Sequence, residues 1–212
     1  MAHGPDGWTR MRITVLVEGK TERAFKPVLQ MFLKNRLEQK MPYLDFFPYD
    51  GRTPKGDDLK RKVETSLRGK RPSDHVIALT DAYTGTTDFQ DAEDAKTKMR
   101  AWVGPETRFT PHVALHEFEV WLLPYWPDIQ RLAGHNKSAP AANPETVNHL
   151  KPPSHRIKEM FEIGTSRDSY SKARDATRIL KGKDLGVAIA QCAELKAFIN
   201  TILRLCEGTE IP

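Results

Sequence analysis

A run of alternating apolar positions, Arg-Ile-Thr-Val-Leu-Val, occupies residues 12–17. Its density of β-branched residues predicts a strand that is buried on both faces. The run stops at Glu18-Gly19, and Thr21 is placed to cap the segment that follows. In that segment apolar residues recur at helical spacing as far as residue 39, so we expect a strand, a tight turn and a helix.

The same alternation continues along the first half of the chain. Strand patterns cover residues 43–49, 75–80 and 110–116, and helical patterns cover residues 57–67, 91–103 and a stretch that begins at residue 117. Strands that alternate with helices predict an α/β fold, with a doubly wound, mostly parallel sheet of four strands.

The pattern changes after residue 135. Residues 136–153 are rich in Pro, Ala and Asn, which predicts a linker or lid, and helical patterns follow at 154–162, 173–180 and 185–205. The last pattern carries an apolar stripe that indicates core packing and no chemistry, formed by Leu185, Ile189, Cys192, Leu195, Ile199, Ile202 and Cys206. We therefore expect a flexible leader (1–10), an α/β domain (11–135), the linker or lid (136–153) and a C-terminal helical lobe packed on the α/β domain (154–212).

Composition narrows the class of protein. With 212 residues and 39% hydrophobic residues, the chain can bury one substantial core. We expect no signal peptide, because the N-terminus is polar, and no run approaches the roughly 18 apolar residues of a membrane span. Cys192 and Cys206 share one face of the predicted last helix and cannot bridge each other there. These features favour a reduced, cytoplasmic protein without a membrane partner.

Positive charge is unevenly distributed, although the net charge is only +5. Lysine and arginine gather in residues 52–71 and again in residues 151–183. Such clusters suit the phosphate backbone of a nucleic acid. A solvated helix face explains either cluster alone equally well.

Carboxylates follow three of the predicted strands: Glu18, Asp81, and the pair Glu117 and Glu119. Parallel strands place their carboxyl ends at one edge of the sheet, where carboxylates repel one another unless a divalent cation neutralises them. Oxygen ligands without cysteine point to Mg²⁺ or Mn²⁺. A metal held in this way supports phosphodiester cleavage, so the sequence predicts a hydrolytic site.

Other roles remain open for several of these residues. Asp81 could simply cap a turn. Glu117 and Glu119 share a face if the strand continues, but they diverge by about 200° if a helix has begun; only one is then a direct ligand, and Glu117 is nearer the strand end. His116 could be a metal ligand, but a structural role, or contact with a ligand residue and not with the metal, suits it better.

Lys20 and Glu22 flank the turn after the first strand. Lys20 is a candidate for phosphate contact. Glu22 either supports the site from behind or favours the start of the helix.

Several strings resemble the Toprim (topoisomerase–primase) domains, and in particular the Toprim-like group catalogued as domain of unknown function 4276. Together they span most of residues 11–206: Val17-Glu18-Gly19-Lys20-Thr21-Glu22, Leu79-Thr80-Asp81-Ala82-Tyr83, the string from Ala114 to Leu123 with its His-Glu-Phe-Glu-x-Trp-Leu-Leu core, Pro153-Ser154-His155-Arg156-Ile157, and Tyr170-Ser171-Lys172.

The resemblance implies a Toprim-like fold and a Mg²⁺-dependent nuclease site. Glu18 would be a general acid/base or a ligand, and Asp81 a metal ligand. Tyr83 stands where the second Asp of the usual Asp-x-Asp motif would be, and Glu117 or Glu119 could replace it. The resemblance also implies a role in prokaryotic genome defence, often beside an ATPase of the ABC/SMC type.

Two functions from different classes follow. The first is a metal-dependent endonuclease for DNA or RNA in anti-phage defence, in which Arg156 and Lys172 bind phosphate and Lys172 also stabilises the transition state. The second is an inactive interaction module that docks on a partner ATPase through aromatic residues that look exposed, namely Trp121, Tyr125 and Trp126, although a core position suits Trp121 better. A third function, phosphotransfer on a small nucleotide, is disfavoured because the sequence lacks a phosphate-binding glycine loop. Homo-oligomerisation stays open.

Overall fold

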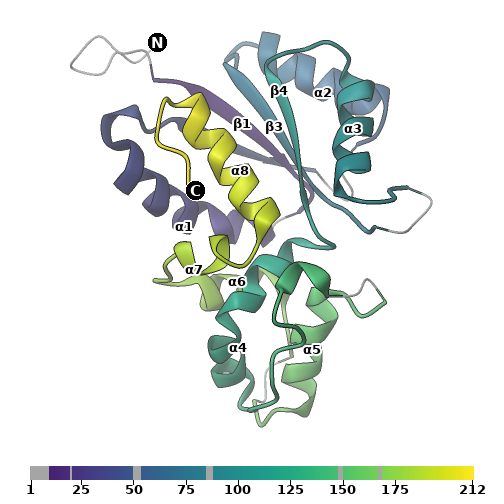
Figure 1. Ribbon diagram of the computed structural model, residues 1–212, viewed down its shortest axis with the longest axis vertical. Coiled ribbons are helices and arrows are strands. Elements are labelled where there is room, and N and C mark those ends of the chain that lie inside the picture. Colours follow the sequence, from purple (N-terminus) through teal and green to yellow (C-terminus); the bar gives the residue numbers. More distant parts are fainter. Residues whose placement is uncertain (1–9, 20, 50–53, 85–87, 148–149, 167–168) are drawn as a thin grey trace.

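Four parallel strands form one sheet in the computed structural model, which describes residues 10–19, 21–49, 54–84, 88–147, 150–166 and 169–212 (Figure 1). The strands are β1 (Arg12–Val17), β2 (Tyr43–Pro48), β3 (His75–Asp81) and β4 (Phe109–Ala114), and their order in the sheet is β2-β1-β3-β4. Each neighbouring pair is parallel. The predicted α/β class and the four-stranded parallel sheet are confirmed.

Helices cover both faces of the sheet, because the side chains of each strand alternate between two cores. Ile13, Val15 and Val17 face one core with α1 (Thr21–Leu37) and α8 (Ala193–Leu205), and Leu16 faces the other. The second core contains residues of α2 (Asp57–Arg68) and α3 (Ala92–Val103). A short 3-10 helix, η1 (Glu38–Lys40), joins α1 to β2.

The end of the chain forms two helices, α7 (Gly186–Ile189) and α8, so the predicted single helix over residues 185–205 is wrong. Cys192 takes an extended conformation, and the Glu145 carboxylate accepts hydrogen bonds from the amides of Ala193 (2.8 Å) and Glu194 (3.0 Å). A distant carboxylate thus satisfies the open amides at the start of α8. The apolar stripe is nevertheless buried along its whole length.

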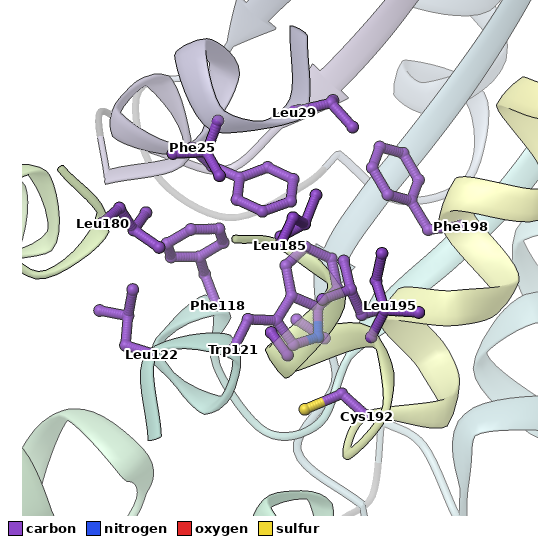
Figure 2. Close-up of a cluster of buried hydrophobic side chains, with 14 of the residues drawn as sticks. Phe25, Leu29, Phe118, Trp121, Leu122, Leu180, Leu185, Cys192, Leu195 and Phe198 are labelled. Carbon is purple, nitrogen blue, oxygen red and sulfur yellow. The ribbon is translucent and has the colours of Figure 1, made fainter. Parts of the chain in front are cut away.

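A 3-10 helix, η2 (Phe118–Tyr125), follows β4 and continues into α4 (Trp126–Ala133). Trp121 stacks on Phe198 with ring centroids 6.0 Å apart and meets Phe118 edge-on, as Figure 2 shows for this core. Trp121, Tyr125 and Trp126 are all buried. The expectation that Tyr125 and Trp126 are exposed is wrong, whereas a core position for Trp121 is confirmed.

Residues 136–147 are irregular apart from the 3-10 helix η3 (Pro144–Thr146), and the lid role proposed for this region stays a prediction. Helices α5 (Pro153–Ile163) and α6 (Lys172–Leu180) follow. Together α4 and α5 project beyond the sheet, while α6 packs beside α1 (Figure 1). Both cysteines are buried and unbridged. In the described ranges, no helix is long and apolar enough to cross a membrane.

Candidate active site

Glu18 and Asp81 meet at the carboxyl ends of β1 and β3. The parallel register pairs Val17 with Leu79, which brings the residues that follow each of them side by side. The Glu18 carboxylate accepts a hydrogen bond from the Thr80 hydroxyl and a second from the Asp81 amide at 3.2 Å. Glu18 is therefore held against the end of β3.

The segment after β4 joins the same edge. Asp81 Oδ1 accepts a hydrogen bond from the Phe118 amide at 2.9 Å. This bond fixes the first turn of η2 to the end of β3, and it places Glu117 and Glu119 on either side of the anchored residue. Carboxylates from three strand ends thus lie along one edge of the sheet.

Lys172, the first residue of α6, reaches this edge from the helical part of the chain. Its Nζ atom lies 3.3 Å from Glu117 Oε1 and 3.4 Å from Glu119 Oε1. Burial lowers the pKa of Lys172, but the charges of Glu119 and Glu117 outweigh burial and raise this pKa overall. Lys172 therefore stays protonated at the site.

The structure brings the carboxylates of Glu117 and Glu119 to the same ammonium group, so the divergence that an α-helix would impose does not occur. Glu117 is still extended, with φ −141° and ψ 158°, and Glu119 lies in the first turn of η2. An extended residue followed by 3-10 turns does not follow the angular spacing of an α-helix.

The environments of the two glutamates differ. Glu117 accepts hydrogen bonds from Tyr83 OH at 2.7 Å and from the Ser154 amide at 2.9 Å. Burial alone would raise the pKa of Glu117, but these bonds and the charge of Lys172 lower it overall. Burial raises the pKa of Glu119 to about 7, although the charge of Lys172, whose Nζ atom lies 3.4 Å from Glu119 Oε1, acts in the opposite direction. Glu119 is thus a buried carboxylate that depends on the charge of Lys172.

Tyr83 and His116 contact residues next to the carboxylates: Tyr83 bonds Glu117, and His116 bonds the backbone of Thr84. Burial raises the pKa of Tyr83, and its hydrogen bond to Glu117 raises it further, so Tyr83 acts as a donor. His116 is buried, and its Nδ1 atom accepts a long hydrogen bond (3.4 Å) from the Thr84 amide. Tyr83 stands where the second Asp of the Asp-x-Asp motif would be. It therefore positions Glu117, which follows the neighbouring strand β4.

Sequence reasoning assigned no role to Thr80, Ser154 and Tyr170. The first two donate to Glu18 and Glu117, and both lie within strings quoted for the family resemblance. Tyr170 is partly buried near Glu119 and Glu117. Its hydroxyl is buried without a hydrogen bond in the described chain. Burial first, and then the charge of Glu119, raise the pKa of Tyr170.

Three predicted residues remain, namely Lys20, Glu22 and Arg156. Lys20 and the side chain of Glu22 fall outside the described residues. Arg156 lies on α5, two positions after Ser154, and forms an ion pair with Glu159 at 3.6 Å.

A pocket of about 320 Å³ opens beside the carboxylates of Glu18 and Asp81. Tyr83 and the apolar side chains of Phe89, Met99 and Trp102 also line it. As the side chains lie, the described ranges contain no group of three or more His, Cys, Asp or Glu residues close enough to hold one metal ion.

Comparisons with known proteins bear on the family and the fold. The family model described as "Domain of unknown function (DUF4276)" matches residues 17–203. The structure of the C-terminal region of the Burkholderia pseudomallei OLD protein is similar, with a TM-score of 0.56 and 13% identity over 93% of this chain and 100% of that chain. The C-terminal region of the Xanthomonas campestris pv. campestris OLD protein matches with a TM-score of 0.47 and 12% identity, over 93% of this chain and 97% of that chain. No curated protein matches the sequence. The Burkholderia structure shares the fold of this chain.

Proposed function

The chain belongs to the Toprim-like family described as "Domain of unknown function (DUF4276)", and from that premise we propose that it is a metal-dependent endonuclease that hydrolyses phosphodiester bonds of DNA or RNA. The observation that carries the proposal is the pairing of Lys172 with Glu117 and Glu119, next to Glu18 and Asp81. A lysine beside clustered carboxylates offers both a cation for the phosphate and oxygen ligands for a metal.

The donor set fits Mg²⁺ or Mn²⁺. All four acids, Glu18, Asp81, Glu117 and Glu119, offer hard oxygen ligands of the kind that these ions prefer. The Glu119 carboxylate is 2% exposed, and Lys172 Nζ lies 3.4 Å from its Oε1 atom, so a cation already approaches this buried charge. When bound, the metal would polarise a phosphoryl oxygen and promote ionisation of the attacking water.

The protein's own groups then have distinct tasks. We assign Glu18 the role of general base or ligand, because Thr80 and the Asp81 amide hold its carboxylate at the edge of the sheet. Tyr83 and Ser154 hold Glu117 in place. Lys172 is about half exposed, so it can contact a phosphate while its stem stays packed, and there it would neutralise charge that develops in the transition state.

Cleavage of labelled single-stranded and duplex oligonucleotides tests this proposal. With Mg²⁺ or Mn²⁺ we expect products from the wild type, none with EDTA, and a loss of at least about 100-fold in Glu18→Gln, Asp81→Asn and Lys172→Met. Glu162→Gln, an exposed carboxylate on α5, is the matched control and should cut like wild type. Equal cleavage by Glu18→Gln and Asp81→Asn would refute the assignment.

We further propose that the protein acts in prokaryotic anti-phage defence, in the cytoplasm, with a partner ATPase of the ABC/SMC type. The family resemblance supports this, as does the similarity to a structure that is itself the C-terminal region of a longer protein. Affinity purification of the tagged chain from its native cell should recover such an ATPase. Recovery of the chain alone, under conditions that preserve known complexes, would argue against the partner.

The alternative, a catalytically inactive docking module, loses its main support because Trp121, Tyr125 and Trp126 are buried. It makes a distinct prediction: an ATPase should co-purify while Mn²⁺ leaves the melting temperature unchanged. A rise in melting temperature with Mn²⁺ that Asp81→Asn abolishes would favour the nuclease.

A further inference from the structure

The pocket beside Glu18 and Asp81 has an aromatic and apolar interior. Met99 and Phe89 form buried parts of its wall, with 1% and 7% of their surface exposed, and Trp102 is only partly buried. The rings of Phe89 and Trp102 lie 6.4 Å apart between centroids, at an angle of 46°. At about 320 Å³ the pocket is at the small end of ligand sites, so it suits one flat ring system.

Basic residues continue outward from this pocket. Lys55 lies in its lining and forms an ion pair with Asp88 at 2.7 Å, and its Nζ atom is 5.8 Å from the centre of the Phe89 ring. A second, shallower hollow shares Pro54 with the pocket and is lined on α2 by Arg61 and Lys62, together with Thr65 and with Asp58, which pairs with Arg61. An apolar pocket for a ring therefore lies between an acidic reaction edge and a basic surface.

Resting on the proposed nuclease function, we propose that this pocket binds the unpaired base of a nucleotide next to the scissile phosphate. Trp102 supplies the stacking surface, and α2 carries the flanking phosphates. Aromatic surfaces bind any base face, whereas cations follow the backbone, and their combination is characteristic of single-strand binding. A paired base is stacked on both faces and is too bulky to enter with its partner, so the site selects single-stranded or frayed nucleic acid.

The test measures binding without catalysis. Fluorescence anisotropy in EDTA compares a labelled single-stranded 10-mer, its duplex, and the same single strand with abasic sites at the central positions. Wild type should bind the single strand about 5- to 150-fold more tightly than either competitor, the range expected when one stacked base is lost. Trp102→Ala should lose that preference, and Trp102→Phe should retain most of it.

Tyr43→Ala is the matched control. Tyr43 is an exposed aromatic at the start of edge strand β2 and is absent from the pocket lining, so its removal should leave binding unchanged. The abasic oligonucleotide tests wild type directly, so the result stands even where Trp102→Ala fails to fold.

The outcomes separate this inference from the nuclease proposal. A base preference that depends on Trp102, without cleavage in any metal, would uphold the pocket and overturn the nuclease. Cleavage with equal binding of abasic and normal strands would uphold the nuclease and overturn the pocket. Failure to bind any oligonucleotide would overturn the pocket as well.

Discussion

Replacing Lys172 by methionine removes the ammonium group that Glu117 and Glu119 share, while keeping a side chain of similar length. At 3.3 Å, one such pair is worth about 5 kcal/mol at an effective dielectric constant near 20. Because 48% of the Lys172 side chain is exposed, solvent screening reduces that value. The glutamates left behind are only 7% and 2% exposed, so their charges become poorly compensated. We expect Lys172→Met to lower the free energy of unfolding by roughly 2–3 kcal/mol.

The assay is urea unfolding at pH 7.5 in EDTA, followed by circular dichroism. Lys181→Met, which removes an exposed lysine just after α6, should change stability by less than about 0.5 kcal/mol. The double variant Lys172→Met/Glu119→Gln should recover much of the loss, because the amide removes the buried charge that Lys172 compensates. When Mn²⁺ replaces EDTA in the buffer, it should stabilise Lys172→Met more than wild type, since an ion can take the place of the ammonium group.

Two results would refute this reasoning. If Lys172→Met is as stable as Lys181→Met, the ion pairs seen in the structure are not significant in solution. If Glu119→Gln fails to relieve the loss, the cost arises from packing of the α6 start and not from charge.

Three further predictions concern the scaffold that holds the site. Burial lowers the pKa of His112 to about 3, so the folded state binds its proton later than the unfolded state, whose histidine titrates near 6.5. Stability should therefore fall as the pH falls below 6.5, and His112→Asn should remove about 2–3 kcal/mol of the loss that wild type shows between pH 7.5 and 4.5; parallel pH curves for the two proteins would contradict this. Trp121→Ala should cost about 3–5 kcal/mol in urea unfolding, because the ring is 1% exposed and stacked on Phe198; a cost below 1 kcal/mol would mean that this core is loosely packed. Gly164→Ala should lower the melting temperature by several degrees, since a Cβ there would lie 1.9 Å from the carbonyl oxygen of Ala133, and an unchanged melting temperature would rule out that close crossing.

The sequence by itself determined the architecture, because both strand and helix impose a period on the side chains that one core or another must bury. The parallel sheet and the carboxylates at its strand ends follow from such local periods. The meeting of Glu18 and Asp81 also follows from the parallel order of the strands, because the pairing of Val17 with Leu79 brings the ends of β1 and β3 together. The sequence likewise predicted correctly that the apolar stripe toward the C-terminus is buried, although two helices, α7 and α8, carry it in place of one.

Tertiary structure decided what each carboxylate contacts. Lys172 approaches Glu117 from 55 positions away, and the Ser154 amide approaches the same carboxylate from a third segment. The break before α8 depends on the carboxylate of Glu145, which no local pattern reveals. Burial of Trp121 and the aromatic pocket at Trp102 also result from packing between distant elements. Charge compensation and cavities are properties of side chains that meet in space, so a one-dimensional pattern fixes where an acid stands but not which cation reaches it.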